Sequence, residues 1–213
     1  MLLVAAPKEP AGNLPFFNPG RSVDFDNSPK VKLSSAFSRL IGEDIHFKAV
    51  LFKAQKAAQS DYPILIKGES GTGKELAARS IYAKSPRSKG PFLEVNCGAL
   101  SEQLLESTLF GYEKGAFTGA VKTTSGYLEE ADGGILFLDE ITDMSPKLQS
   151  SLLRVLQEHT FTRLGSAQVS SSDFRLLCAT NKRLTEEVKA GNFREDLFYR
   201  INVVALEILP LRE

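Results

Sequence analysis

A run of eight residues, GESGTGKE, combines the residue types that hold phosphate. It follows the apolar run YPILIK and opens a stretch of helical character, which is the context that a phosphate-binding loop requires. The glycines let backbone N–H groups turn inward around phosphate oxygens, and the N-terminus of the following helix adds its positive dipole end. Lys74 can reach the β- and γ-phosphates of a nucleotide, so we prefer this interpretation to a plain glycine turn. The predicted nucleotide-binding residues are Gly68, Glu69, Ser70, Gly71, Thr72, Gly73, Lys74 and Glu75.

Two adjacent acids, Asp139 and Glu140, end the apolar run GGILFLDE. A strand this apolar is buried, so its last residues emerge at the sheet edge where α/β proteins bind ligands. Hydrolysis of a nucleoside triphosphate needs one carboxylate for Mg²⁺ and another group that orients the attacking water. We therefore assign the metal to Asp139, directly or through its water shell, and the water to Glu140. An acid pair that merely caps a helix is the alternative. One feature departs from the usual pattern, because Glu75 stands where Ser or Thr normally helps bind Mg²⁺.

The run GYEKGAFTGA, residues 111–120, contains three glycines and therefore makes a poor helix and a poor strand. It nevertheless carries Phe117 beside Thr118, in what we interpret as a flexible loop. The aromatic ring either tucks back onto the protein surface or contacts a partner, for which aromatic side chains are common hot spots. The loop alone leaves both interpretations open.

Short apolar runs alternate with helical patterns along the chain, which predicts a parallel sheet with helices on both faces. Apolar residues recur at helical spacing over residues 44–59. Ser101, and Ser145 followed by Pro146, are the expected starts of two further helices. The predicted fold class is α/β, a three-layer αβα sandwich with a mostly parallel sheet. The expected strands cover residues 62–67, 91–95, 133–140, 161–165, 174–180 and 203–208. Residues 68–84 are expected to form a glycine turn that leads into a helix, and the other helices are expected at 101–110, 145–159, 183–191 and 193–200.

Composition narrows the class of protein further. The 213 residues carry 26 basic and 26 acidic side chains, and without a long basic run no nucleic-acid surface is indicated. No apolar run approaches a membrane span, and MLLVAA does not fit a signal peptide, so we expect a cytoplasmic protein without membrane contact. Cys97 and Cys178 are expected to be buried free thiols, with a disulfide as the alternative. Five of the ten prolines fall within the first 36 residues, which predicts a linker over residues 1–38 and one domain over 39–213.

The chain resembles the central ATPase domain of bacterial sigma-54-dependent transcriptional activators, which belong to the AAA+ class. The resemblance is carried by the order and spacing of four motifs, GESGTGKE, FGYEKGAFTGA, GGILFLDE and FREDLFYRINV. The resemblance covers about residues 40–212, GAFTGA is close to a family identifier, and the Glu after the lysine is usual in this family. It implies a P-loop NTPase of the AAA+ type that uses ATP and Mg²⁺. It also implies a ring of identical subunits, commonly a hexamer, that hydrolyses ATP at subunit boundaries and remodels the sigma-54 RNA polymerase holoenzyme.

The resemblance assigns roles to individual residues. Asn96 matches an asparagine that pairs with the catalytic Glu140, although a buried Asn bonded to backbone is the alternative. Arg194 and Arg200 match arginines that reach the γ-phosphate of a neighbouring subunit; surface ion pairing is the other interpretation. Thr180 and Asn181 match the first sensor of nucleotide state, unless they simply cap a strand, and Ile41 matches the segment near adenine. Residues 163–173 match a second pore-facing loop or form an ordinary loop. The residues expected to contact sigma-54, now preferred over a tucked aromatic ring, are Gly115, Ala116, Phe117, Thr118, Gly119 and Ala120.

The match ends where the chain ends, at ILPLRE, and Leu209 replaces the first proline that is usual there. We therefore expect a domain that lacks the helical lid and encodes no DNA-binding segment. Two functions remain open: an ATP-hydrolysing activator core, and a truncated nucleotide-binding fragment that contacts sigma-54 without efficient turnover. A different AAA+ machine is disfavoured by GAFTGA.

Overall fold

A computed structural model of the chain describes residues 33–38, 40, 42 and 44–210. Most of the predicted linker lies outside the described residues, as does Ile41. The compact unit begins at Leu33, before the boundary expected after residue 38. The reason is the short helix η2 (Ser35–Phe37), which places Phe37 in the core at 2% exposure.

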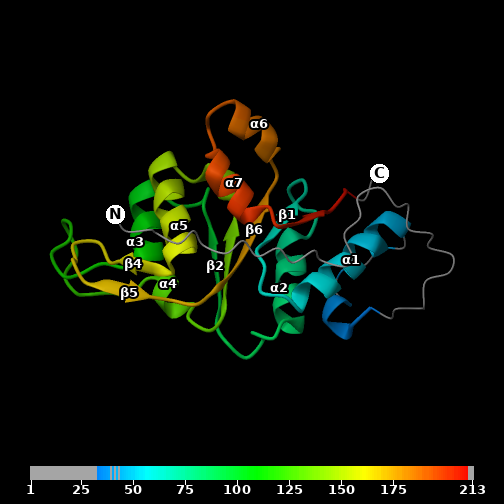
Figure 1. Cartoon of the computed structure of the whole chain (residues 1–213), viewed down its shortest axis with the longest axis horizontal. Coiled ribbons are helices and arrows are strands. Elements are labelled where there is room, and N and C mark those ends of the chain that lie inside the picture. The colour runs from blue at the N-terminus through cyan, green and yellow to red at the C-terminus, as the bar shows by residue number, and fades with distance from the viewer. Residues whose placement is uncertain (1–32, 39, 41, 43, 211–213) are drawn as a thin grey trace, which may run out of the picture. The chain divides into compact units, whose positions relative to one another are not determined.

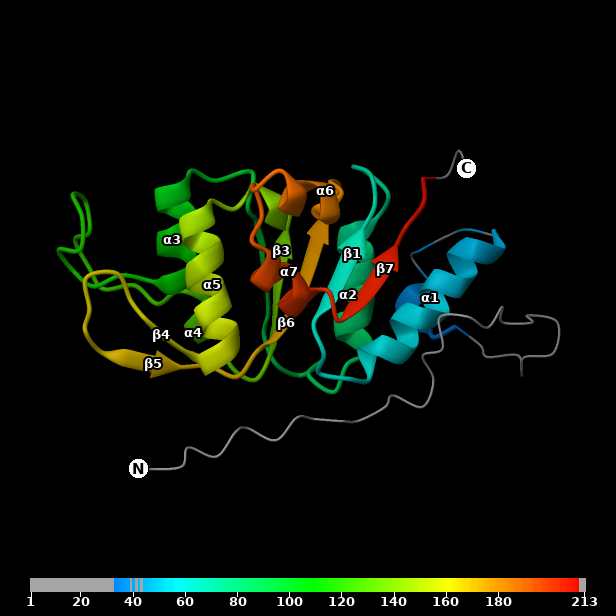
Figure 2. The same ribbon diagram turned by 45° about the horizontal axis from the view of Figure 1, so that its top comes forward.

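Five parallel strands form the central sheet in the order β2-β3-β6-β1-β7 (Figures 1 and 2). The strand β1 (Ile64–Lys67) pairs with β6 (Arg175–Thr180) on one side and with β7 (Val204–Glu207) on the other. Beyond β6 lies β3 (Ile135–Asp139), and β2 (Phe92–Asn96) forms the edge. Because all five strands run in the same direction, their carboxyl ends meet along one edge of the sheet.

Helices cover both faces of this sheet, which confirms the predicted αβα arrangement. Side chains of β3 alternate between two cores: Ile135 and Phe137 enter one, and Leu136 and Leu138 enter the other. The first core is closed by α1 (Ile45–Ala58) and α2 (Lys74–Lys84). The second is closed by five helices, α3 (Glu102–Phe110), α4 (Tyr127–Glu130), α5 (Pro146–Glu158), α6 (Leu184–Lys189) and α7 (Glu195–Ile201).

A separate hairpin of two antiparallel strands departs from the prediction. The strand β4 (Thr160–Thr162) was expected at 161–165, and β5 (Val169–Ser171) falls inside the segment that was interpreted as a loop. With the sequence VSS, β5 has no apolar alternation from which a strand could be predicted. The single turn of α4 was also missed, since four residues are too few to show a helical period.

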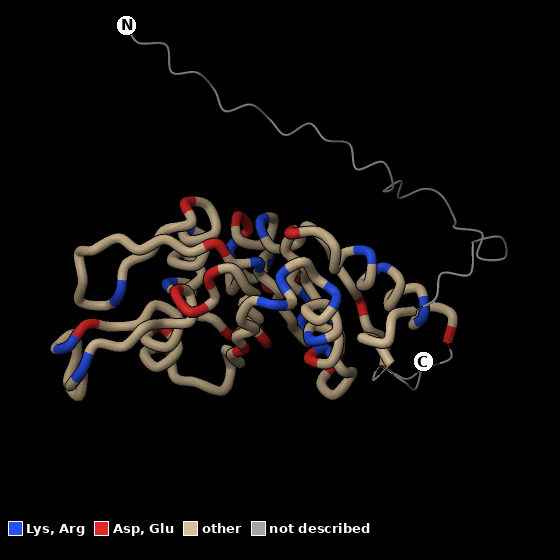
Figure 3. The backbone as a smooth tube through the Cα atoms, turned by 90° about the horizontal axis from the view of Figure 1, so that it is seen from below, with Lys and Arg blue, Asp and Glu red and all other residues tan. Residues whose placement is uncertain are grey.

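Local expectations are met at several other points. Ser145 accepts a hydrogen bond from Leu148 N at the start of α5, as an N-cap should. Ser101 occupies the N-cap position of α3, although its hydroxyl makes no capping bond. Cys97 and Cys178 are buried free thiols, so the disulfide alternative is wrong. Basic and acidic residues are both spread over the described backbone (Figure 3). None of the described helices is long and apolar enough to cross a membrane.

Arg175, at the start of β6, is a buried cation that satisfies the end of a helix. Its side chain donates to Ala57 O at 2.7 Å, Ala58 O at 2.9 Å and Tyr62 O at 3.1 Å, so it caps the C-terminus of α1. Burial lowers the pKa of the Arg175 guanidinium to about 10, and it therefore stays protonated at neutral pH. A cation also complements the negative end of the helix dipole.

We expect Arg175→Met to lower the free energy of unfolding by about 3 kcal/mol, because it removes the donor from three carbonyls, of which that of Ala58 is buried, while keeping most of the side-chain volume. Urea unfolding at neutral pH measures this change. The control is Arg183→Met, which removes an exposed ion pair with Glu186 and should change stability by about 0.5 kcal/mol or less. Equal stability of the two variants would show that the guanidinium does not hold α1.

Candidate functional site

The glycine-rich segment connects β1 to α2 and has the backbone geometry of a phosphate cradle. Gly71 and Gly73 have φ values of +80° and +87°, a region that residues with a side chain rarely adopt. Gly73 is the N-cap of α2, so the helix begins at Lys74 and directs its free N–H groups into the loop. A Cβ added at Gly71 would meet no atom within 4 Å, which leaves open space beside the loop. These residues therefore fit a phosphate chain.

Lys74 is the centre of this loop. Although it is a lysine, it is only 7% exposed, and its Nζ donates to Gly68 O at 3.0 Å and to Glu69 O at 3.2 Å. The same Nζ lies 3.4 Å from Glu140 Oε1. The lysine and one member of the acid pair thus face each other across the carboxyl edge of the sheet, as the two motifs predicted.

Glu140 has an unusual backbone. Its φ of 49° and ψ of 50° place it in the left-handed region, which is rare for a residue other than glycine and is often found at functional sites. Its carboxylate meets Lys74 on one side, and Oε2 accepts from Asn181 N at 3.0 Å on the other. The Glu140 side chain is therefore held at the end of β6, between Lys74 of the cradle and the backbone of Asn181.

Asp139 closes β3 beside it. Its Oδ1 accepts from Glu140 N at 3.0 Å, and its Oδ2 accepts from Asn96 Nδ2 at 3.2 Å. Burial raises the pKa of Asp139 and the neighbouring charge of Glu140 adds to this, while Lys74 and the hydrogen bonds oppose it. Within the described residues, no group of three or more metal-ligating side chains is present. The Asp139 carboxylate offers the hard oxygen donors that Mg²⁺ takes, and proteins usually hold this ion with one or two carboxylates together with waters and substrate phosphates.

The expected pairing of Asn96 with Glu140 is wrong in this structure. The parallel register of β2 and β3 places Asn96 opposite Asp139, so the amide bonds to that acid. Its Oδ1 accepts from Gly98 N at 2.9 Å and Ala99 N at 3.0 Å, in the segment that leads into α3. The alternative of a backbone-bonded Asn is therefore partly right, except that Asn96 is exposed.

Thr180 and Asn181, the two residues expected to form the first sensor, are placed differently from each other. Thr180, fully buried at the end of β6, has its hydroxyl 3.0 Å from the hydroxyl of Thr142, and the same oxygen accepts from Lys182 N at 3.0 Å. Asn181 is exposed and contributes its backbone N–H to Glu140. The Thr142 contact was not predicted, because nothing in the local sequence reveals which hydroxyl a buried threonine will meet.

Arg194 is the N-cap residue of α7 and Arg200 lies within this helix, and their hydrogen bonds go to their own surroundings. Arg194 forms two bonds with Asp196, at 2.7 and 3.0 Å, and one with Ser150 Oγ at 3.2 Å. Arg200 donates to Leu156 O at 2.6 Å. Both arginines are exposed. Within one chain Arg194 forms a surface ion pair with Asp196, which is the alternative interpretation given above.

The GAFTGA loop and the β4–β5 hairpin project together beyond α3 (Figures 1 and 2). The backbone of Tyr112 bridges both Thr124 and Leu164, which joins the base of the loop to the hairpin. Arg163 then donates to Glu113 at 2.9 Å and to Glu129 at 2.8 Å, linking the hairpin to both ends of the loop. A lone arginine in a turn sequence carries no signal that could have predicted this bridge.

The tip of the loop differs from expectation. Thr118 is exposed as predicted, but Phe117 is half-buried and packs edge-to-face on Tyr112, with ring centroids 5.0 Å apart at 60°. In this conformation the ring does tuck back, which is the interpretation that the resemblance had displaced.

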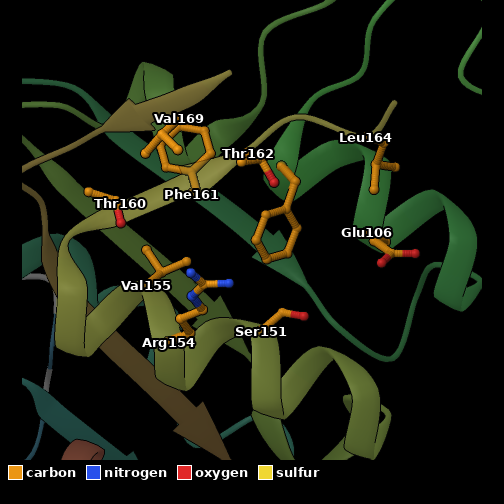
Figure 4. A pocket seen from close by; sticks show the side chains of 10 residues that line it. Glu106, Ser151, Arg154, Val155, Thr160, Phe161, Thr162, Leu164 and Val169 are labelled. Atoms are coloured by element: carbon orange, nitrogen blue, oxygen red, sulfur yellow. The ribbon is translucent and has the colours of Figure 1, made fainter. Parts of the chain in front are cut away.

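Two cavities flank these features. One of about 480 Å³ lies at the carboxyl edge of β1, β6 and β7, beside the glycine loop; it is lined by Lys67, Gly68, Glu69, Asn181, Lys182, Arg183, Leu184, Thr185, Glu207, Ile208, Leu209 and Pro210. The other, of about 210 Å³, lies between α3, α5 and the hairpin, where Phe110, Val155 and Phe161 meet Glu106 and Arg154 (Figure 4). The second cavity leaves room between the hairpin and α5.

A parallel sheet, a glycine cradle before a helix, its lysine, and an acid pair at the end of β3, with β6 between β3 and β1, together define a P-loop NTPase domain. The Sigma-54 interaction domain family matches residues 40–207 of the chain. The chain therefore belongs to this family, the interaction domains of sigma-54-dependent activators.

Named relatives agree with this assignment. The chain is 52% identical over 185 residues to the transcriptional regulatory protein ZraR of Klebsiella oxytoca, covering 87% of this chain and 42% of that protein. It is also 52% identical over 186 residues to the sigma54-dependent transcriptional regulator SfnR of Pseudomonas fluorescens, covering 87% and 51%. The nif-specific regulatory protein of Azotobacter vinelandii is 53% identical over 174 residues, covering 82% and 33%. The chain thus spans only a third to a half of the length of these relatives.

Solved structures share the fold. NtrX from Brucella abortus in complex with ATP has a TM-score of 0.75 and 38% identity, covering 81% of this chain and 39% of NtrX. The P-loop NTPase domain of the sigma-54 transport activator from E. coli has a TM-score of 0.55 and 18% identity over 80% of this chain, which supports the fold alone.

Proposed function

We propose that this chain is an ATP-hydrolysing core that couples turnover in a ring of identical subunits to remodelling of the sigma-54 RNA polymerase holoenzyme at promoters. The observation that carries the proposal is the meeting of Lys74, Asp139 and Glu140 at one edge of the sheet, in a domain that also projects a glycine-hinged aromatic loop. Family membership and the relative that binds ATP support it.

The residues around the cradle have distinct tasks in this proposal. The N–H groups at the start of α2 and the Lys74 ammonium bind the β- and γ-phosphates of ATP. Asp139 holds Mg²⁺, which neutralises charge on the phosphates when bound. When Lys74 turns to phosphate oxygens, Glu140 loses its ionic partner and becomes free to orient the attacking water and accept its proton. Glu75 is bonded to Arg79 on the outer face of α2, and we assign it no metal.

The second half of the active site comes from a neighbouring subunit. Arg194, at the N-cap of α7, and Arg200, within this helix, are exposed and bond to residues of their own surroundings rather than to the cradle. An arginine supplied by an adjacent subunit stabilises charge on the transferring phosphoryl group. This arrangement makes the ring, as a hexamer, a condition for turnover.

A chain of contacts connects the site to the loop. Asn96 binds Asp139 and accepts from two N–H groups at the entrance to α3. The helix α3 is braced against α5, because Ser145 donates to Glu102 at 2.6 Å and Lys147 bonds to Glu106 at 2.7 Å. A change at Asp139 is thereby transmitted along α3 to residues 115–120, which contact sigma-54.

We expect Thr118→Ala to spare ATP hydrolysis and to weaken sigma-54 binding strongly, because this exposed side chain lies at the loop tip, away from the cradle. Losing an interface hot spot costs about 2 kcal/mol, which is roughly a thirtyfold weaker affinity. Phosphate release and a sigma-54 binding titration of the full chain measure the two effects.

The matched control is Thr108→Ala, in α3, whose hydroxyl donates to Leu104 O of the same helix at 2.7 Å. It should change neither quantity. Retained sigma-54 binding by Thr118→Ala would count against the role of the loop, and with it against the proposed partner.

A further inference from the structure

The ring pair between Tyr112 and Phe117 joins two parts of one loop that are held very differently. Tyr112 is fixed on both sides, since its N–H and C=O both bond to Thr124 at 2.9 Å. The neighbouring Glu113 N donates to Leu164 O at 3.0 Å, which adds the hairpin to this anchorage. The Tyr112 ring is therefore part of a stationary base.

Phe117 belongs to the part of the loop that can pivot. Gly115 and Gly119 flank it with φ values of +85° and +100°, and a Cβ added at either would meet nothing within 4 Å. The tip is closed by Gly115 N donating to Ala120 O at 2.8 Å, so it can move as a unit about the two glycines.

The aromatic contact joins the Phe117 ring to this base, and the backbone of the tip is also joined to it where Ala116 N donates to Glu113 O at 3.0 Å. The two rings meet edge-to-face at 5.0 Å, a favourable geometry for an aromatic pair, and Phe117 is half-buried as a result. A second contact lies close by, since a Cβ at Gly165 in the hairpin turn would come within 2.8 Å of Ala116 Cβ. While the pair is intact, Phe117 cannot offer its whole face to a partner.

We infer that Tyr112 is a positioning residue that stores Phe117 in the resting loop, so that engagement of sigma-54 requires this ring pair to open. The inference rests on the proposed function. Tyr112 thereby sets the fraction of loops that expose Phe117 before nucleotide binds. Removing the Tyr112 ring shifts the population of loops toward the conformation in which Phe117 is exposed. The tyrosine touches neither the cradle residues nor the acid pair, and it acts only through Phe117.

The 213 residues contain no Trp, so Phe117→Trp provides a single tryptophan as fluorescent reporter in this chain. In this background we expect low acrylamide quenching without nucleotide and a rise with a non-hydrolysable ATP analogue. Adding Tyr112→Ala should give high quenching in both states, whereas Tyr112→Phe, which keeps the ring, should match the parent. Quenching of the Tyr112→Ala reporter that equals the parent overturns the inference, provided circular dichroism shows that the variant is folded; Tyr112→Leu repeats the test if it is not.

A second measurement uses native Phe117 and purified sigma-54. Tyr112→Ala should raise nucleotide-free binding several-fold and leave phosphate release unchanged, and Tyr112→Phe should restore the nucleotide requirement. Nucleotide-free binding that does not rise in Tyr112→Ala, while the parent binds with nucleotide, overturns the inference alone. If no variant binds sigma-54 in any nucleotide state, the proposed function fails instead, and the quenching result still decides whether Tyr112 stores the ring.

Discussion

Glu140→Gln is expected to bind ATP at least as tightly as the parent chain and to lower phosphate release by about 10²- to 10⁴-fold. The amide keeps the size of the side chain but cannot take a proton from water. It also removes the negative partner that lies 3.4 Å from Lys74 Nζ, which frees the ammonium for phosphate oxygens. Titration with a fluorescent ATP analogue and steady-state phosphate release at saturating ATP give the two quantities separately.

The control for this variant is Glu130→Gln, which makes the same chemical change at an exposed acid at the end of α4. It should leave both quantities unchanged. Turnover of Glu140→Gln close to that of the parent would refute the assignment of the base, whatever its affinity for ATP.

Arg194→Ala is expected to reduce turnover by about 10³-fold or more, although the residue lies apart from the cradle of its own chain. Within one chain its partners are Asp196 and Ser150, and an exposed pair of this kind contributes little to stability. A large loss in a folded variant therefore indicates action in a neighbouring subunit. Turnover of the parent should also rise more steeply than linearly with protein concentration.

Mixing two inactive variants makes this prediction sharper. The Glu140→Gln subunit keeps Arg194, and the Arg194→Ala subunit keeps Glu140. When the two are neighbours, their shared site contains both residues only if the Arg194→Ala subunit supplies the cradle and the Glu140→Gln subunit supplies the arginine. Random mixing in equal amounts should therefore recover activity at about a quarter of the boundaries of a cyclic ring. Arg154→Ala, which removes an exposed ion pair with Glu158, serves as the control and should behave like the parent. Activity that is linear in protein and unaffected by Arg194→Ala would exclude a shared site.

Much of the site could be predicted because its parts are local. The cradle needs only consecutive residues with glycine where φ is positive, followed by a helix, and Gly71, Gly73 and Lys74 meet these conditions. The burial of β3 on both faces was visible in its continuous apolar run, and that run placed Asp139 at the sheet edge. The αβα layering followed from the alternation of such runs with helical patterns.

Pairings between distant segments could not be read in the same way. Asn96 meets Asp139 rather than Glu140 because the register of two parallel strands decides which side chains lie opposite each other. The same holds for Arg163, which joins Glu113 and Glu129, and for the three-residue strand β5, which exists only because β4 lies beside it. Such contacts depend on how whole elements pack, and short polar segments carry no periodicity that reveals it.

The residue types that could do chemistry in this chain are thus found in contiguous motifs, whereas the contacts that these residues make depend on the folded domain. Residue type and spacing were enough to indicate a phosphate cradle and an acid pair at the sheet edge, since backbone conformation over a few residues is governed by local sterics. For residues 115–120 they left two interpretations open, and only the family resemblance favoured contact with a partner. Which side chains the residues of these motifs contact was decided by the packing of the folded domain. It placed Lys74 against Glu140, and Phe117 against a ring five residues earlier, on a base pinned by Thr124 and Leu164. These contacts form only when separate strands, helices and turns are brought together, and for that reason only the tertiary structure could show them.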